Sequence, residues 1–436
     1  MTPNDARSEG PAGSTVFREE NHDLPVARLS VTLRLGAAAD PADQMGLTAF
    51  AAELARRGAG GRGRTQLDAE LERLGAELEV VPGYDSVVLD LEVLARNFEP
   101  AVRLLADVLL LPDLDEGEAT KLQRETIAAL DELRDDDSAL AQRFFSHQLY
   151  GDHPYGRPLH GTEPSLTRLS APLARRTLER TIAGGNLIFG LAGDVERDRF
   201  EAILARRFGS LRSGSTATEP LPTLRPASKL RLLLVDKPER TQSQILLGQP
   251  APRWADPDFL PLQVAATAFG GTFTARLMTE VRVKRGLSYG ATARLGQGRG
   301  ARALAVTVFP SLVDTPKTLA LVLELWRAWV EEGLTEDEVE FAKNHMAGSF
   351  GFHIATPEDR LDLAVAAEVC GLPRDYRERA VARIRAVTCE EVRGAMERHL
   401  RPQDLAITVV STAKKLRGPL SKVFSGPIEV VPYGSF

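Results

Sequence analysis

The sequence has 436 residues and a net charge of −6, and it is 43% hydrophobic and 26% charged, the composition of a soluble globular protein. This length suits two or more domains, and the interspersed charges exclude the basic stripe of a nucleic-acid-binding protein. Two cysteines, Cys370 and Cys389, exclude a disulfide framework and are predicted to be buried small hydrophobes, while no apolar run is long enough to span a bilayer.

The N-terminal segment differs from the rest of the chain. Residues 1–15 (MTPNDARSEGPAGST) lack the apolar core of a signal peptide and are predicted to be a short disordered lead. The protein is therefore expected in the cytoplasm, or in the periplasm if a leader has been removed.

The first half of the chain alternates strands and helices. Residues 29–35 alternate apolar and polar side chains, which predicts a strand with one buried face, and residues 77–81 and 86–94 are predicted to pair as a hairpin. Asp115 and Glu118 have the spacing of a capping box, which predicts a long helix to about residue 133. The other predicted elements are helices over residues 46–57, 65–74 (ended by Gly75), 98–111 and 200–208, and a buried strand over residues 186–192.

The second half repeats this pattern after a linker. Residues 210–228 are rich in Ser, Thr and Pro, which is typical of a linker, and Thr335 and Glu338 repeat the capping box 220 residues after Asp115. We interpret the repetition as an internal duplication in an α+β fold. Two tandem homologous domains, over residues 16–209 and 229–436, are each predicted to be a mostly antiparallel sheet packed with helices. The predicted elements here are strands over residues 230–235, 244–248, 303–309 and 404–410 and helices over residues 259–269, 316–331 and from Thr335 onward.

The stretch over residues 269–290, FGGTFTARLMTEVRVKRGLSYG, carries the most local information. Residues 274–285 are predicted to form a helix ended by Gly286, which readily takes a left-handed backbone. Arg282 lies in its last turn and Tyr289 just beyond it. In one interpretation Arg282 is solvated near the negative end of the helix dipole; in the other, its guanidinium and the Tyr289 phenol are two donors for one carbonyl oxygen. The apolar positions that share one helix face are Leu277, Met278 and Val281.

Four segments can be read together: AAADPADQMGLTAFAAEL, ETIAALDELRDDD, GDHPYGRPLHGT and GGTFTARLMTEVRVKRGLSYG. With the order of elements and the duplication, they resemble the M16 family of peptidases, which includes insulinase, pitrilysin and the mitochondrial processing peptidase. The similarity extends over residues 16–410. It implies two tandem M16-type domains, the first with the family's zinc-motif helix and the second with an Arg/Tyr pair.

The sequence departs from the family at the metal site. Active members carry HxxEH, in which two His bind Zn²⁺ and the Glu activates the metal-bound water. Alignment with GLTAFAAEL places Ala49 and Glu53 at the two His positions and Ala52 at the Glu position. A methyl group has no electron pair to donate, and one carboxylate without imidazole partners is a poor zinc site. The family's distal Glu ligand falls on Glu132, which is expected to be structural or solvated.

Other residues offer no clear replacement for these ligands. None of the seven His residues forms an HxxxH or HxxEH pair. His153 and His160 flank a loop rich in Pro and Gly and could approach each other, but we do not expect a metal site there. This chain is therefore expected to hold no metal or other cofactor.

The Arg/Tyr pair of the family is present as Arg282 and Tyr289. In the family these two residues bind substrate carbonyls near the zinc of the partner subunit, where donors stabilise the tetrahedral intermediate. The resemblance thus implies a non-catalytic subunit of a heterodimeric M16 zinc metallopeptidase, with zinc in an HxxEH-containing partner and an extended peptide substrate. The alternative is a catalytically dead scaffold or peptide-binding protein in which the pair is a relic. A self-sufficient peptidase with unusual ligands is a third hypothesis.

Overall fold

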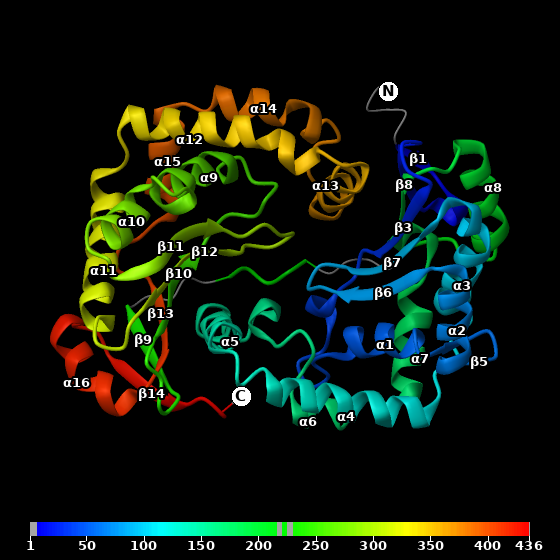
Figure 1. Ribbon diagram of the computed structural model, residues 1–436, viewed down its shortest axis with the longest axis horizontal. Coiled ribbons are helices and arrows are strands. Elements are labelled where there is room, and N and C mark those ends of the chain that lie inside the picture. The colour runs from blue at the N-terminus through cyan, green and yellow to red at the C-terminus, as the bar shows by residue number, and fades with distance from the viewer. Residues whose placement is uncertain (1–6, 216–219, 225–229, 436) are drawn as a thin grey trace. The chain divides into compact units, whose positions relative to one another are not determined.

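The computed structural model describes residues 7–215, 220–224 and 230–435, and the chain forms two compact units (Figure 1). The first unit comprises Met1–Ala129, Arg157–Leu221 and Gly351–Glu378, and the second comprises Leu130–Gly156, Pro222–Phe350 and Arg379–Phe436. Each unit therefore includes a segment from the other half of the sequence. Of the predicted linker over residues 210–228, residues 216–219 and 225–228 lie outside the described residues.

The prediction of a disordered lead over residues 1–15 is wrong for residues 7–15, while residues 1–6 lie outside the described residues. Strand β1 (Arg7–Glu9) pairs antiparallel with β2 (Thr15–Glu20). The Arg7 guanidinium also donates to Glu368 at 3.1 Å. Backbone pairing and an ion pair hold this segment, and neither is visible in its polar composition.

A six-stranded sheet forms the centre of the first unit. It also contains β3 (Val26–Leu33), β6 (Glu77–Pro82), β7 (Val87–Leu94) and β8 (Leu187–Gly193), in the order β1-β2-β8-β3-β7-β6. All neighbours pair antiparallel except β2 and β8. Strand β3 places apolar side chains on one face and Arg28, Ser30 and Thr32 on the other. A separate short ribbon consists of β4 (Gly58–Ala59) and β5 (Arg62–Gly63).

The sheet of the second unit repeats this topology. It contains β9 (Arg231–Asp236), β10 (Gln244–Pro250), β11 (Ser288–Leu295), β12 (Ala303–Pro310), β13 (Ala406–Ser411) and β14 (Ile428–Pro432), in the order β11-β12-β10-β13-β9-β14. The parallel pair of β9 and β13 corresponds to β2 and β8, and β10, β11 and β12 correspond to β3, β6 and β7. The prediction of a duplicated, mostly antiparallel α+β domain is confirmed. The copies differ at one edge, where β14 is parallel to β9 but β1 is antiparallel to β2.

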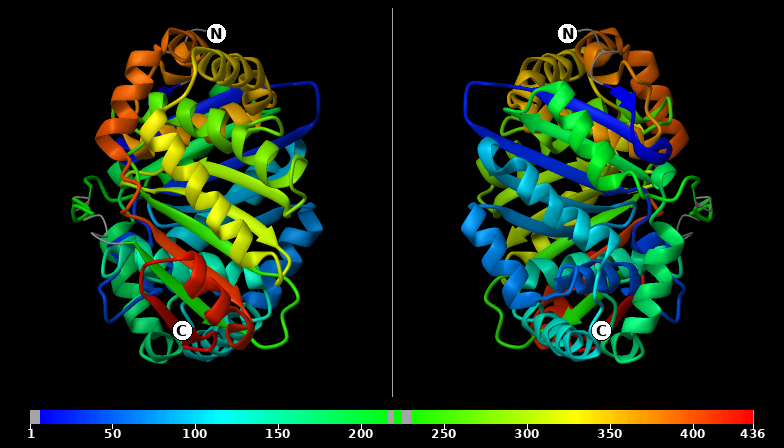
Figure 2. Two further views of the ribbon diagram at one scale, coloured as in Figure 1. Left: turned by 90° about the vertical axis from the view of Figure 1, so that its left-hand side faces the viewer. Right: turned by 90° about the vertical axis from the view of Figure 1, so that its right-hand side faces the viewer.

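Helices pack on the sheets (Figure 2): α3 (Phe98–Leu110) contacts β7 of the first sheet, and buried side chains of α11 (Thr315–Glu332) share one core cluster with those of the second sheet. The longer helices of the described residues are α1 (Leu47–Ala55), α2 (Arg64–Leu74), α3 (Phe98–Leu110), α4 (Glu116–Glu132), α5 (Asp137–Tyr150), α7 (Ala171–Thr181), α8 (Arg197–Phe208), α9 (Phe259–Ala266), α11 (Thr315–Glu332), α12 (Glu336–Ser349), α13 (Pro357–Cys370), α14 (Tyr376–Ala386), α15 (Cys389–His399) and α16 (Ala413–Val423). Two short helices are α6 (Glu163–Leu166) and α10 (Arg276–Met278). Within the described residues, no helix combines the length and the apolar character that crossing a membrane requires.

Two equivalent helices are exchanged between the copies. Helix α5 follows the long helix α4, and α13 follows α12 in the same way, but each packs on the sheet of the other half of the sequence. On the second sheet, Gln148 of α5 accepts from the Thr408 hydroxyl at 2.9 Å. On the first sheet, Arg28 of β3 donates to Asp362 of α13 at 2.8 Å, so α13 covers the polar face.

Two smaller predictions concern cysteine burial and surface charge. Cys370 and Cys389 are half-buried, not buried as predicted, because each lies at the end of a helix, the last residue of α13 and the first of α15.

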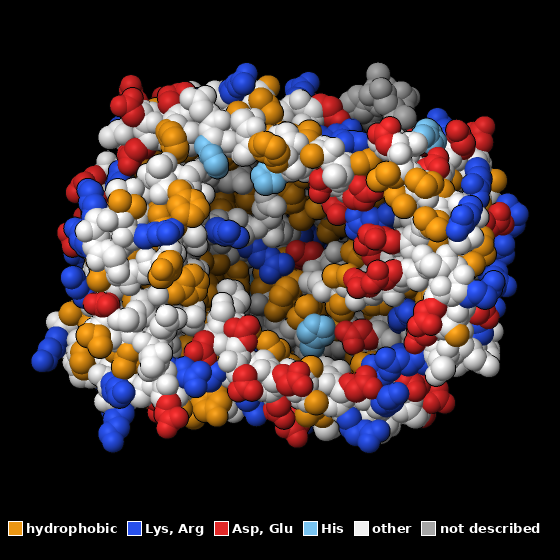
Figure 3. Space-filling view, in the orientation of Figure 1, with side chains coloured by type: hydrophobic (Ala, Val, Ile, Leu, Met, Phe, Trp, Pro, Cys, Tyr) orange, Lys and Arg blue, Asp and Glu red, His pale blue; other side chains and the backbone are white. Residues whose placement is uncertain are grey.

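Positive and negative side chains are interspersed over the face shown in Figure 3, as the sequence pattern indicates.

Candidate functional site

The N-terminus of α1 is held against the loop that contains His160. Gly46 has φ +86°, and a Cβ there would lie 2.7 Å from the backbone of His160. Gly161 has φ +80°, and its Cβ would lie 2.4 Å from the Met45 carbonyl oxygen. Glycine is therefore required at both positions, because each has a left-handed backbone and because the two segments approach too closely for a side chain. This contact brings His160 beside the helix that resembles the zinc-motif helix of the family.

Asp40 caps the first turn of α1. Its buried carboxylate accepts from the Thr48 backbone N–H at 3.1 Å and from the Thr48 hydroxyl. Burial raises the pKa of Asp40 to about 6, and the hydrogen bonds from Thr48 oppose this shift. Asp40 was not predicted from the sequence, because its partner Thr48 is eight positions away, outside the usual capping spacing.

The three zinc-motif positions of α1 do not supply a zinc site. Ala49 is 1% exposed and Ala52 is 9% exposed, so two methyl groups are packed where ligands or a base are needed. The carboxylate of Glu53 lies 3.6 Å from Nδ1 of His160. Burial raises the pKa of Glu53, while the charges of His160 and Arg57 oppose this shift. One carboxylate and one imidazole do not fit the three or four protein ligands that zinc takes, and in the described part of the chain this pair belongs to no larger group of metal-ligand side chains.

Glu132 and His153, the two other residues considered for a metal site, belong to the second unit. Glu132 is the exposed last residue of α4 and belongs to the second unit. His153, also in the second unit, is buried, and its ring nitrogens contact the Pro222 carbonyl oxygen and the Tyr155 backbone N–H, each at 3.1 Å. Its ring is therefore occupied by structural contacts.

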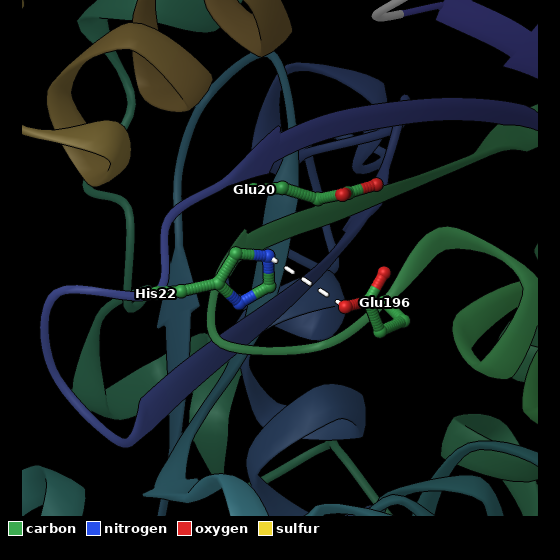
Figure 4. A group of neighbouring side chains, drawn as sticks. All are labelled: Glu20, His22 and Glu196. Atoms are coloured by element: carbon green, nitrogen blue, oxygen red, sulfur yellow. Dashed lines mark ion pairs between the residues drawn. The ribbon is translucent and has the colours of Figure 1, made fainter.

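One group of three metal-ligand side chains was not predicted from the sequence. Glu20, His22 and Glu196 lie close together at the surface of the first unit (Figure 4). His22 is tied to Asp194, with Nδ1 and Oδ1 2.6 Å apart, and this hydrogen bond raises the pKa of His22. The group is open to solvent, and such exposed acidic groups are common without an ion. We assign it no role.

The stretch over residues 269–290 belongs to the second unit and is anchored by Phe269. Its buried ring stacks on Trp329, with centroids 4.3 Å apart and planes 7° apart. The predicted helix over residues 274–285 is partly wrong, because α10 ends at Met278 and a wider π-helical turn follows over Thr279–Val283. Gly286 has φ +61°, as predicted for the residue that ends the turn. The predicted apolar face is buried, namely Leu277, Met278 and Val281.

The structure brings the side chains of Arg282 and Tyr289 together. A bulge in β11 between Ser288 and Ala291 contains Tyr289, which is 88% exposed. The Arg282 guanidinium carbon lies 5.7 Å from the Tyr289 ring centroid and 5.4 Å from that of Phe273, which is 72% exposed. We call these three residues the aromatic–arginine cluster. Phe273 was not predicted from the sequence, although a bulky aromatic residue shortly after a Gly-Gly pair could have indicated an exposed loop tip.

The cations around this cluster are neutralised, whereas Arg282 is not. Arg276 donates to Glu338 at 2.8 Å, and Lys284 and Arg285 both pair with Glu280. Across the residues that the structure describes, Arg282 makes no ion pair and no side-chain hydrogen bond. A half-buried guanidinium without a carboxylate, beside two exposed rings, is available to a ligand that carries an acceptor.

Comparison with known proteins agrees with this organisation. Two family models match the sequence: Insulinase (Peptidase family M16) over residues 15–163 and Peptidase M16 inactive domain over residues 175–346. The chain belongs to the peptidase M16 family. Helix α1 lacks the two His ligands and the Glu base of the HxxEH motif, so the chain is an inactive M16-like protein.

Relatives extend over nearly the full length of the chain. The non-peptidase homolog YmxG of Helicobacter pylori is 24% identical over 401 residues, which cover 92% of each chain. An uncharacterized zinc protease of Mycobacterium tuberculosis is 28% identical over 407 residues, which cover 90% of each chain. A crystal structure of a peptidase M16 inactive domain from Pseudomonas fluorescens superposes with a TM-score of 0.85 at 24% identity, over 93% of this chain and 97% of that chain. This last likeness shows the fold.

Proposed function

We propose that the protein is the non-catalytic subunit of a heterodimeric M16 zinc metallopeptidase. The observation that carries the proposal is the unpaired Arg282 beside the exposed Tyr289, in a chain whose α1 has alanine both at a zinc-ligand position, Ala49, and at the position of the general base, Ala52. The partner subunit would hold HxxEH and the zinc ion, and this chain would hold none. The substrate would be a peptide in extended conformation.

The chemistry assigned to the cluster is electrostatic. Addition of water to a peptide carbonyl places negative charge on oxygen, and donors already in position lower the energy of that state. Arg282 is always charged and forms no ion pair with a carboxylate of the described residues, and the Tyr289 hydroxyl adds a neutral donor. Loss of one such donor costs about 3 kcal/mol, a rate factor of about 100.

An extended substrate can bind by strand addition. Strand β11, which contains Tyr289, is an edge strand. Among the described residues it pairs with β12 alone, so the backbone groups of its outer side have no ladder partner there. A peptide next to β11 would be positioned by backbone hydrogen bonds, with the cluster beside it.

The test is reconstitution with an HxxEH-containing M16 protein of similar length from a neighbouring reading frame. We expect the two chains to copurify, the complex to contain one zinc and cleave a fluorogenic peptide, and each chain alone to be inactive. Arg282→Ala should lower kcat/KM of the complex about 100-fold without dissociating it. Arg285→Ala, which removes a neighbouring cation that is paired with Glu280, is the matched control and should leave kcat/KM within about twofold. Normal kcat/KM in the Arg282→Ala complex would refute the role in trans.

The second candidate is a catalytically dead scaffold or peptide-binding protein. The similarity to a protein named as a non-peptidase homolog supports it. In this case no HxxEH-containing chain would copurify, and Arg282→Ala and Tyr289→Phe would change no peptidase activity. The absence of such a chain from the neighbouring frames would favour this candidate.

A further inference from the structure

The first unit contains a cavity between its N-terminal strands and the segment after α13. It has a volume of about 520 Å³, within the usual size range of sites for small organic ligands. Its apolar lining includes Phe17 of β2, Leu361 and Ala364 of α13, and Leu372 and Tyr376 beyond that helix. Phe17 and Leu361 belong to a small buried cluster, so this part of the lining is continuous with the core. We call this space the α13 cavity.

Ion pairs hold the walls of the α13 cavity in place. Glu368 of α13 accepts from Arg7 at 3.1 Å and from Arg34 at 2.9 Å. Glu19 of β2 accepts from Arg360 at 2.9 Å and also pairs with Arg377. These contacts connect the strands to α13 and to the residues after it, so the cavity is formed before any ligand enters. A ligand that binds to a preformed cavity loses less free energy to ordering of the protein.

One positive charge at the cavity is not neutralised. Four arginines line the space, and three of them are paired: Arg7 with Glu368, Arg18 with Glu201 and Arg377 with Glu19. The fourth, Arg374, is exposed and makes no ion pair or hydrogen bond in the part of the chain that the structure describes. The lining also contains four carboxylates, and each of them has a partner: Glu19, Glu368 and Glu378 form ion pairs, and Asp375 is engaged as well. The lining therefore combines an apolar part with paired charges, and Arg374 is its charged group without a partner among the described residues.

We propose that the α13 cavity binds an amphiphile with an apolar chain and a single carboxylate, a medium-chain fatty acid or its equivalent. The chain lies against Phe17, Leu361, Ala364 and Leu372, and the carboxylate pairs with Arg374. The apolar lining supplies affinity, because each methylene removed from water tightens binding about fourfold. The charge selects a carboxylate over a cationic head group, and guanidinium and carboxylate also match in hydrogen-bond geometry. This site is independent of the aromatic–arginine cluster.

The experiment is isothermal titration of the full chain with sodium dodecanoate below its micellar concentration. We expect one dodecanoate to bind per chain, with affinity that increases about fourfold per methylene from octanoate to dodecanoate. Arg374→Glu reverses an exposed charge that has no partner, so it should leave the fold intact and weaken dodecanoate binding at least tenfold. Ala364→Trp fills the cavity and should abolish binding, and unchanged circular dichroism and melting temperature will show whether that variant is folded.

The controls separate this site from general surfactant binding. Arg417→Glu makes the same charge change at another exposed arginine, on α16, and should leave dodecanoate affinity unchanged. Dodecyltrimethylammonium should bind at least tenfold more weakly than dodecanoate. No saturable dodecanoate binding, equal affinity in the Arg374→Glu protein, or equal affinity for the cationic amphiphile would each overturn the proposal.

Discussion

The M16 resemblance implies functional groups at two places, the α1 region of the first unit and the aromatic–arginine cluster of the second unit. The side chains of the α1 region are fixed by their neighbours, whereas those of the cluster are exposed or unpaired. In the α1 region, Ala49 and Ala52 are packed into the interior and Glu53 faces His160. In the cluster, Arg282 has no carboxylate partner among the described residues and Tyr289 is 88% exposed. Groups fixed by their neighbours stabilise the fold, whereas an unpaired charge beside exposed rings is available to a ligand. Substitutions in the α1 region should therefore change stability, and substitutions in the cluster should change chemistry.

The largest effect is expected from Gly46→Val at the start of α1. Valine must adopt φ near +86°, and its Cβ would lie 2.7 Å from the His160 backbone. Left-handed strain of about 1–2 kcal/mol and overpacking of about 1–3 kcal/mol together give a loss of about 4 kcal/mol in the free energy of unfolding. Urea titration of the isolated chain measures this loss. Gly63→Ala, where a Cβ meets nothing within 4 Å, is the control and should change the free energy by less than about 1 kcal/mol. Equal effects of both substitutions would show that the contact between α1 and the His160 loop is not important for stability.

The next effect is a pH dependence caused by Asp40. The pKa of Asp40 is raised to about 6 by burial, so the folded state binds a proton that the unfolded chain releases near pH 4. The stability contribution of this group is complete below about pH 4 and is lost as the pH rises through about 6, by up to about 3 kcal/mol. Asp40→Asn, which keeps one acceptor for Thr48, should therefore gain stability relative to the unmodified chain between pH 4 and pH 6.5. Thermal unfolding of both proteins across this pH range tests the sign, and a constant difference between them would contradict it.

A smaller effect is expected from Phe273→Leu in the cluster. Leucine keeps apolar volume but removes the ring face beside the Arg282 guanidinium, an interaction of about 0.5–1 kcal/mol at an exposed site. If the ring orients Arg282 for the substrate, kcat/KM of the reconstituted complex should fall two- to fivefold, and Phe273→Tyr should restore it. The melting temperature of the chain should remain within about 1 °C, because Phe273 is 72% exposed. A loss of stability without a change in kcat/KM would reverse the contrast between the two regions.

The elements with a clear hydrophobic period were predictable from sequence, but their tertiary partners were not. The hairpin of β6 and β7 and the capping box at Thr335 follow from local patterns and are confirmed. Helix α5 was missed, although the Asp136 side chain caps it by accepting from the Ser138 and Ala139 backbone N–H groups. Helices α5 and α13 each pack on the sheet of the other half of the sequence. This exchange could not be predicted, because the apolar pattern of a helix does not specify which of two homologous sheets it covers.

The candidate site shows the same limit. Arg282 and Tyr289 are close in sequence around one turn, so their proximity could be inferred from spacing. His160 reaches Glu53 only through the contact of two distant backbone segments at Gly46 and Gly161. Phe273 lies beside Arg282, which belongs to a π-helical turn where a regular helix was predicted, and helical periodicity does not reveal such a turn.

The smallest effect is expected from His160→Ala, which tests whether the α1 region retains any chemistry. The imidazole lies 3.6 Å from Glu53 and its side chain is 41% exposed, so the pair should contribute less than about 1 kcal/mol to stability. Removal of the imidazole also removes an attraction that lowers the pKa of Glu53, so this pKa should rise further in the variant. The zinc content and kcat/KM of the reconstituted complex should stay within about twofold of the unmodified values, because neither residue is expected to contact metal or substrate. A tenfold loss of either quantity would show that Glu53 and His160 act in the reaction, and the α1 region would then have to be regarded as a second functional site.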